Sequence, residues 1–181
     1  MNISIVEVLR AIQSLLQGLT VSDGTPAFET VALYDLPNLD TALSDLLENT
    51  TARVCLVVPS GIDYASTQTG TSMIISPILS LELILSHQDY EPGKPALWGS
   101  DVYPGVVNII DPVRAMLDGN QLSLDPRLTV VPQSAGSIRV AADEETVGEG
   151  REGMVLGYQV HFPPEKYPLN RGAHLSNLSK S

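Results

Sequence analysis

The sequence is poor in cysteine, in aromatic residues and in positive charge. Of its 181 residues, one is cysteine, 5% are aromatic, and 10 are basic against 21 acidic. A single cysteine excludes a disulfide within the chain, and its place in the apolar run RVCLVV predicts that Cys55 is a buried hydrophobic side chain rather than a reactive thiol. Few aromatic residues leave little material for a deep recognition pocket, so we expect an aliphatic core.

The acidic residues all lie within the first 165 positions. That part holds 7 basic and 21 acidic residues, a net charge of −14, whereas residues 166–181 carry +3. An acidic surface repels nucleic acids and anionic membranes. We therefore expect no membrane association and no direct binding to DNA, beside which the protein can still lie.

The sequence lacks the signs of secretion or membrane insertion. Its start, MNISIVEVLR, has no basic segment before an uninterrupted apolar stretch, and no apolar run is long enough to cross a bilayer. We expect a soluble protein of the cytoplasm. The length predicts one domain, residues 1–165, followed by a basic tail, residues 166–181, that is extended or flexible.

Hydrophobic periodicity predicts three helices and about six strands. The helices are expected at 3–19, 38–49 and within 105–118, the strands at 27–35, 52–59, 73–86, 127–133, 137–147 and 153–163, and long loops at 60–72 and 87–105. The strand at 52–59 is expected to be central and covered on both faces. In the strand at 73–86, Leu79, Leu81, Leu83 and Leu85 are expected to share one face. The segregated order of these elements favours an α+β fold, with a mixed or antiparallel sheet of about five to six strands and the helices packed on it.

The third predicted helix contains a proline and a charged residue among apolar ones. Because of Pro112, this helix either runs, kinked, from Gly105 or begins with Asp111 as its N-cap. Gly119 is expected to end it. Arg114 is predicted to project from the buried face toward an acid on this chain or on a neighbouring subunit.

No motif predicts catalysis, so we expect no enzyme activity, metal or cofactor. Residues 148–153, GEGREG, match the dinucleotide pattern G-x-G-x-x-G, but a strand is expected after them where nucleotide binding needs a helix. The three histidines lack second ligands at metal-binding spacing, and no serine lies in a G-x-S-x-G motif. Asp143, Glu144 and Glu145 lack the alternation of a calcium loop and indicate a solvated turn.

Four of the nine aromatic residues fall in the two predicted loops. They are Tyr64, Tyr90, Trp98 and Tyr103. Aromatic side chains on loops often become buried anchors when a partner covers them. The four are therefore candidates for a partner interface, and the alternative is that they fold back over the edge of the sheet.

The order of these elements, with several short motifs, resembles the tail terminator (tail completion) proteins of long-tailed bacteriophages. The resemblance covers residues 3–163 in outline. Its matching positions are Gly105, Val113, Arg114, Leu117 and Gly119 of the third helix and the closing strand LGYQVHF. Pro112 departs from the pattern of this family.

The resemblance implies a structural virion protein of the tail or neck, assembled in the host cytoplasm. A homo-hexameric ring would cap the tail tube, end its polymerisation and present a surface to the head-tail connector, and in a contractile tail the sheath would be a further partner. DNA would pass nearby without specific binding, with Asp143, Glu144 and Glu145 as candidates for an acidic lumen. Arg114 joins the four aromatic residues as a candidate for partner contacts.

Two alternatives remain open. The first is another phage neck or minor tail protein. The second is a small-molecule enzyme or binding domain whose site is assembled from residues scattered in the sequence.

Overall fold

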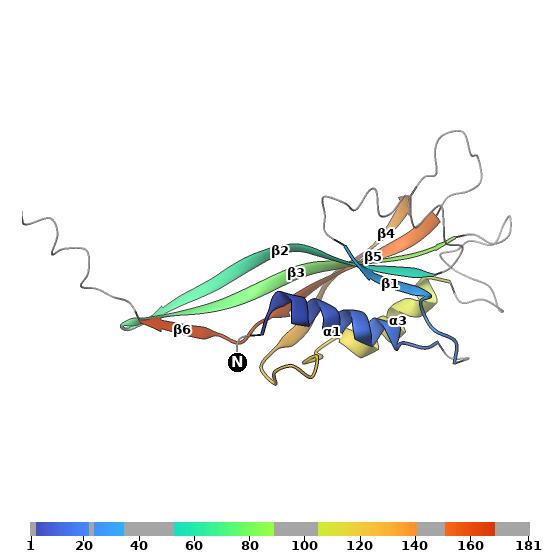
Figure 1. Cartoon of the computed structure of the whole chain (residues 1–181). Coiled ribbons are helices and arrows are strands. Elements are labelled where there is room, and N and C mark those ends of the chain that lie inside the picture. The colour runs from blue at the N-terminus through green and yellow to red at the C-terminus, as the bar shows by residue number, and fades with distance from the viewer. Residues whose placement is uncertain (1–2, 22–23, 35–52, 89–104, 141–150, 169–181) are drawn as a thin grey trace, which may run out of the picture.

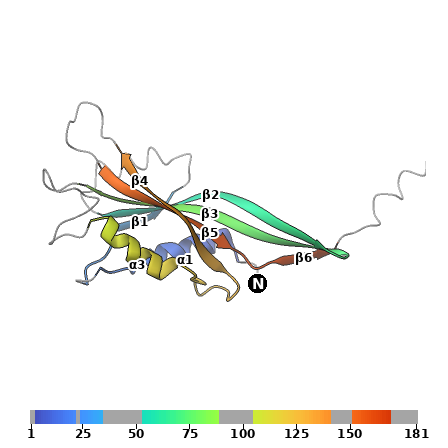
Figure 2. The same ribbon diagram turned by 180° about the vertical axis from the view of Figure 1, so that it is seen from behind.

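The computed structural model describes residues 3–21, 24–34, 53–88, 105–140 and 151–168. Its helices are α1 (Ile5–Gln17) and α3 (Val107–Leu117), and its strands are β1 (Thr30–Leu33), β2 (Val54–Thr69), β3 (Ser72–Gln88), β4 (Thr129–Val140), β5 (Arg151–His161) and β6 (Glu165–Pro168). The strands form one mixed sheet in the order β1-β2-β3-β5-β4, and β6 pairs with β3. Both helices lie on the same face of this sheet (Figure 1, Figure 2). The predicted α+β fold is confirmed.

Helix α1 begins at a capping box and buries one stripe of its surface. Ser4 Oγ accepts a hydrogen bond from the Glu7 N–H at 3.2 Å, and the Glu7 carboxylate accepts one from the Ser4 N–H at 2.7 Å. These two bonds satisfy amides that a helix start leaves without partners. Val8, Ile12 and Leu16 recur every four residues and are fully buried. The amphipathic helix predicted at residues 3–19 is confirmed.

Helix α3 begins at Val107 and continues through Pro112, which is nearer to the predicted start at Gly105 and excludes the alternative start with Asp111 as the N-cap. Proline has no N–H for the carbonyl four residues earlier. The helix persists because its buried stripe of Ile109, Val113 and Leu117 packs in the core. Gly119 follows the helix with φ +73, a conformation that suits glycine at this position.

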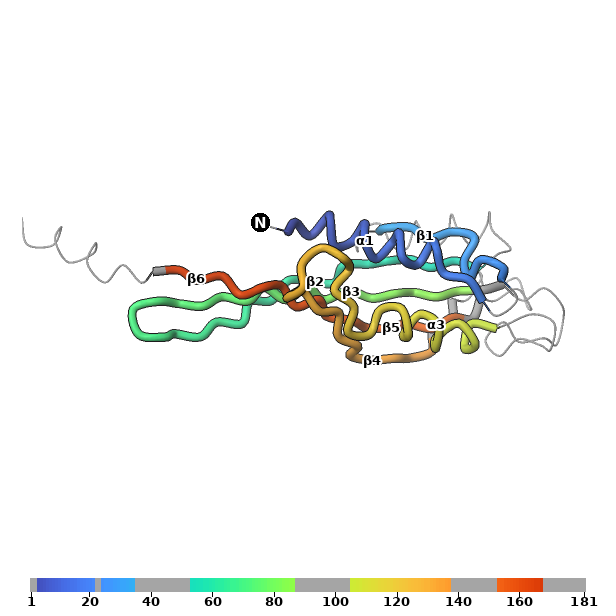
Figure 3. The backbone as a smooth tube through the Cα atoms, turned by 90° about the horizontal axis from the view of Figure 1, so that it is seen from below, coloured from blue at the N-terminus to red at the C-terminus, as the bar shows by residue number. Residues whose placement is uncertain are grey.

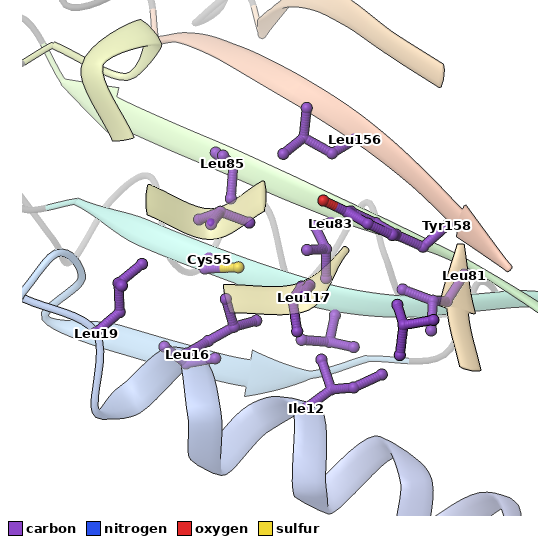
Figure 4. Packing of buried hydrophobic residues seen from close by; sticks show 14 of the residues in the cluster. Ile12, Leu16, Leu19, Cys55, Leu81, Leu83, Leu85, Leu117, Leu156 and Tyr158 are labelled. Atoms are coloured by element: carbon purple, nitrogen blue, oxygen red, sulfur yellow. The ribbon is translucent and has the colours of Figure 1, made fainter. Parts of the chain in front are cut away.

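The main core lies between the two helices and the sheet. Figure 4 shows side chains of α1, α3 and the central strands meeting there. In β3, the alternate residues Leu79, Leu81, Leu83 and Leu85 point into this core, as predicted from their spacing. Because successive residues of a strand point to opposite faces, the residues between them lie on the far side of the sheet.

The first part of β2 is buried on both faces. Cys55 and Val57 belong to the main core, whereas Val54, Leu56 and Val58 form a second cluster with Ile84. Burial raises the pKa of the Cys55 thiol well above its usual range. The predictions of a doubly covered strand and of a buried cysteine are both confirmed.

A loop was predicted at residues 60–72, but these residues form the outer half of a long β2–β3 hairpin. Pairing continues from Gly61↔Ser80 to Thr69↔Ser72, and the turn between the strands consists of Gly70, with φ +59, and Thr71. The loop prediction is wrong because this part of β2 is exposed, and a strand without a buried face need not show hydrophobic alternation.

Two further predictions for the strands are corrected. The strands predicted at 127–133 and 137–147 are joined in one strand, β4, which continues through a bulge at Pro132/Ser134. Residues 166–168 were expected to begin an extended or flexible tail; they are extended, but with Glu165 they form β6, paired along Ser72–Ile75 of β3. Local sequence patterns show neither feature, because each depends on pairing with a distant strand.

Several predictions concern residues outside the described ranges. They are the helix at 38–49, the loop at 87–105 except its ends, and Asp143, Glu144 and Glu145. β5 begins at Arg151, within the GEGREG segment, so the segment leads into a strand, as predicted, and not into a helix. Among the described residues, no helix is both long and apolar enough for a membrane span.

Candidate functional site

The outer half of the β2–β3 hairpin projects from the body of the protein as a single layer of sheet. We use the name arm for Gly61–Ser76 together with β6. The arm extends past both helices, which lie beside the inner half of the hairpin (Figure 1, Figure 3). Residues 60–71 are all exposed. Among the described residues, the arm therefore has no second layer to pack against, unlike the centre of the sheet.

A β-bulge marks the start of the arm. Pro59 pairs with Leu81, but the next pair is Gly61↔Ser80, so Ser60 is an extra residue in β2. A bulge bends its strand and increases the local twist. The bulge lies where β2 changes from a buried strand to an exposed one.

One face of the arm carries exposed apolar side chains. Residues opposite each other in a ladder share a face, as do residues two apart in one strand. The pairs Tyr64↔Pro77 and Met73↔Tyr167 thus place five apolar side chains on one face, which they share with Ser66, Gln68 and Glu165. We name them the arm patch: Ile62, Tyr64, Met73, Ile75 and Tyr167. In this patch, Ile62 is 42% exposed, Tyr64 66% and Tyr167 44%.

The arm differs from the rest of this acidic chain in carrying little charge. Its charged residues are Asp63, Glu165 and Lys166. The Tyr167 hydroxyl donates a hydrogen bond to the Glu165 carboxylate, and this bond raises the pKa of Tyr167. Large apolar side chains gathered on an exposed, weakly charged surface are typical of a protein interface.

Tyr64 is the one aromatic candidate of the four that lies among the described residues, and it belongs to the arm patch. It lies on a strand rather than on a loop, and its exposure shows that it does not fold back over the sheet edge. Tyr90, Trp98 and Tyr103 lie outside the described residues. Sequence reasoning missed Tyr167, because only the pairing of β6 brings it to the arm.

Arg114 lies on the exposed side of α3, not on its buried face as predicted, but its partner is an acid of this chain, one of the two predicted alternatives. Its side chain is 54% exposed, and Nε donates to Oδ2 of Asp118, one turn further along the same helix, at 3.2 Å. The other carboxylate oxygen, Oδ1, accepts a hydrogen bond from the Tyr158 hydroxyl at 3.2 Å. Burial, followed by the charge of Asp118, raises the pKa of Tyr158. This network ties the end of α3 to β5.

A hollow of about 580 Å³ lies near the end of α1. Its lining residues are Gln17, Thr25, Pro26, Phe28, Glu29, Val31 and Arg53. Arg53 Nη2 donates to the Pro26 carbonyl at 3.0 Å, whereas Nη1 is buried without a hydrogen-bond partner in the described part of the chain. Glu29 in the same lining opposes the attraction of an anion to Arg53. Among the described residues, no cluster of three histidine, cysteine or acidic side chains could hold a metal.

Comparisons with known proteins assign no family. No protein family matches the chain, and no curated protein matches its sequence. The arm and its patch are therefore the features from which a function is argued.

Proposed function

We propose that the protein is a ring-forming structural subunit that caps the end of a bacteriophage tail tube, ends tube polymerisation and joins the tail to the head connector. The arm carries this proposal. Its patch exposes Ile62, Tyr64 and Tyr167 on a single layer of sheet. Such a surface gains burial only when another molecule covers it, and identical subunits most often assemble with closed symmetry.

The charge of the chain supports the same proposal. A ring around a DNA conduit must let DNA pass without holding it, and the net charge of −14 up to Glu165 suits that task. The partners are then other copies of this chain, the tube protein and the connector, with the sheath added in a contractile tail. No catalytic step belongs to this role.

Mass measurement in solution tests the ring. We expect about six copies, or a monomer that becomes a ring when tube ends are added. Tyr64→Glu should abolish ring formation, because it places a charge within the apolar patch. Val6→Glu is the matched control, since Val6 is 54% exposed on α1 and does not belong to the arm patch, and this variant should assemble normally.

A chain that stays monomeric with and without tube ends, and that is stabilised by a small ligand, would overturn the ring. The role at the tail has its own test in a phage that carries the gene. Deletion should yield tails of uncontrolled length or heads without tails. Normal virions after deletion would rule out the terminator role and leave a ring of another kind.

The hollow beside Arg53 supports the second candidate function, a small-molecule binding domain. The buried Nη1 of Arg53 is a hydrogen-bond donor that a bound carboxylate or phosphate would satisfy. Thermal unfolding with phosphate or citrate tests this candidate. A rise in the melting temperature that is absent in Arg53→Gln would favour binding over a purely structural role.

A further inference from the structure

We propose that subunits join edge to edge, the free β2 edge of the arm in one copy pairing with the outer edge of β4 in the next. The inference rests on the proposed ring and names a second contact that forms it, in addition to the arm patch. It concerns the hydrogen-bonding edges of two strands, which are distinct from the apolar face of the arm.

The arm has one unpaired edge. On one side of the hairpin, β6 pairs with Ser72–Ile75 of β3. On the other side, β1 pairs with β2 from Val54 to Val57 and reaches no further. In the part of the chain that the structure describes, the residues from Gly61 to Thr69 therefore have a strand partner on the β3 side alone.

The outer edge of β4 is unpaired in a similar way. β4 is the last strand in the order of the sheet. At its start, Val130 exchanges hydrogen bonds with Gly119 and Asn120. Beyond the bulge at Pro132/Ser134, residues 133–137 are exposed and pair with β5 alone among the described strands.

Both edges lack the usual protection against pairing. Natural sheets guard long edges with charged residues, above all lysine, or with prolines and bulges. Here each free edge begins after a bulge, and Asp63 is the one charged residue between Pro59 and Leu81. Residues 129–137 of β4 carry no charge. An unguarded edge of this kind is a template for another strand.

The occupant of each edge is a second copy of this chain, because one chain carries both edges on opposite sides of its sheet. Each copy therefore offers the next one the edge that it needs. Two copies that each carry a net charge of −11 repel one another, and contact through two nearly uncharged strands adds little to that repulsion.

The positions of the two edges favour a ring over a simple dimer. The free β2 edge lies on the β1 side of the sheet, and β4 lies at the opposite side. Joining opposite edges is a head-to-tail contact, which leaves one free edge on each end of a growing chain of subunits. Such a row of subunits closes into a ring when the rotations from each subunit to the next add up to one full turn.

Paired cysteines test the contact, since the native Cys55 is buried and its thiol pKa is raised. We combine Ser66→Cys or Thr67→Cys in the arm with Ala135→Cys or Gly136→Cys in β4, so that both faces of each strand are sampled. The space beside Gly136 is open to a side chain. A short bismaleimide spanning about 8 Å, roughly two residues along a strand, allows for the register.

Treatment of the assembled ring should give a ladder of cross-linked chains up to the full ring for at least one pair. Each single-cysteine variant should give no ladder. Amide hydrogen exchange provides a second readout. Exchange at residues 61–69 and 133–137 should slow by about tenfold or more on assembly, because edge pairing places their amides in hydrogen bonds. A contact made through side chains alone would leave these amides exposed to solvent.

A ring that forms without any ladder and without slower exchange would overturn edge pairing and leave the ring itself intact. Cross-linked dimers from a variant with an arm cysteine alone would show that arms pair with arms, and would also overturn the proposed pairing of β2 with β4. Cross-links that reach only the tube protein would overturn it as well. A chain that forms no ring under any condition would overturn the proposed function and this inference together.

Discussion

The inner and outer halves of the β2–β3 hairpin share a ladder but differ in what covers them. In the inner half, Val54–Val58 is buried on both faces. In the outer half, no residue of β2 from Gly61 to Thr69 is buried. The same backbone hydrogen bonds run through both halves. The comparison shows that pairing gives the hairpin its shape, whereas burial decides which half stabilises the fold.

The energetic difference between the halves follows from their burial. Fully burying a large aliphatic side chain contributes roughly 1.5–3 kcal/mol, and exposed residues contribute little. The inner half should therefore unfold only with the whole domain, whereas the arm can open locally. An arm of low local stability is suited to a contact that forms during assembly.

Truncation of one aliphatic residue in each half should give the largest contrast in stability. Leu83→Ala removes a fully buried side chain and should lower the free energy of unfolding by about 3 kcal/mol. Ile62→Ala, at a 42% exposed position of the arm, should lower it by less than about 1 kcal/mol. Urea denaturation of the monomer measures both. Equal losses would show that the arm is packed as well as the core.

A smaller loss of stability is expected from the hydrogen bond between Tyr158 and Asp118, at the edge of the core. Tyr158→Phe removes the hydrogen bond to Asp118 and should cost about 1 kcal/mol at neutral pH. The pKa of Tyr158 in the folded protein is raised above its ordinary value of about 10. Its contribution is therefore complete below pH 10 and decreases as the pH rises beyond that value, since the unfolded phenol then loses its proton more readily.

Urea denaturation of wild type and Tyr158→Phe from pH 8 to pH 11 checks this sign. The difference in stability between the two proteins should be constant up to about pH 9.5 and should shrink above it. A difference that grows with pH would contradict the raised pKa.

The smallest effect on global unfolding is expected at the tip of the arm. Gly70 has φ +59, a conformation that costs other residues roughly 1 kcal/mol or more. Gly70→Ala should speed hydrogen exchange in the arm and leave the urea midpoint unchanged, because the strain is relieved by local opening. A shift of the midpoint as large as that of Leu83→Ala would show that the two halves unfold as one unit.

The sequence predictions were right for the inner half of the hairpin and wrong for the outer half. The regular spacing of Leu79, Leu81, Leu83 and Leu85 predicted the inner half of β3 and the face that it buries. Residues 60–72 carry no such spacing because the arm has no buried side. The same cause hid the candidate site: the alternation of Ile62 with Tyr64 spans too few residues to indicate a strand, and Tyr167 is far away in the sequence.

The sequence by itself determined the α+β class, the amphipathic helix α1, the doubly buried start of β2 and the fate of Cys55. Each of these follows from side chains that are near one another in the chain and repeat at the period of a helix or strand. Only the tertiary structure decided that β2 and β3 continue as an arm and that β6 pairs beside it. These features depend on which distant strands pair and on how far the helices reach, and no local pattern records either.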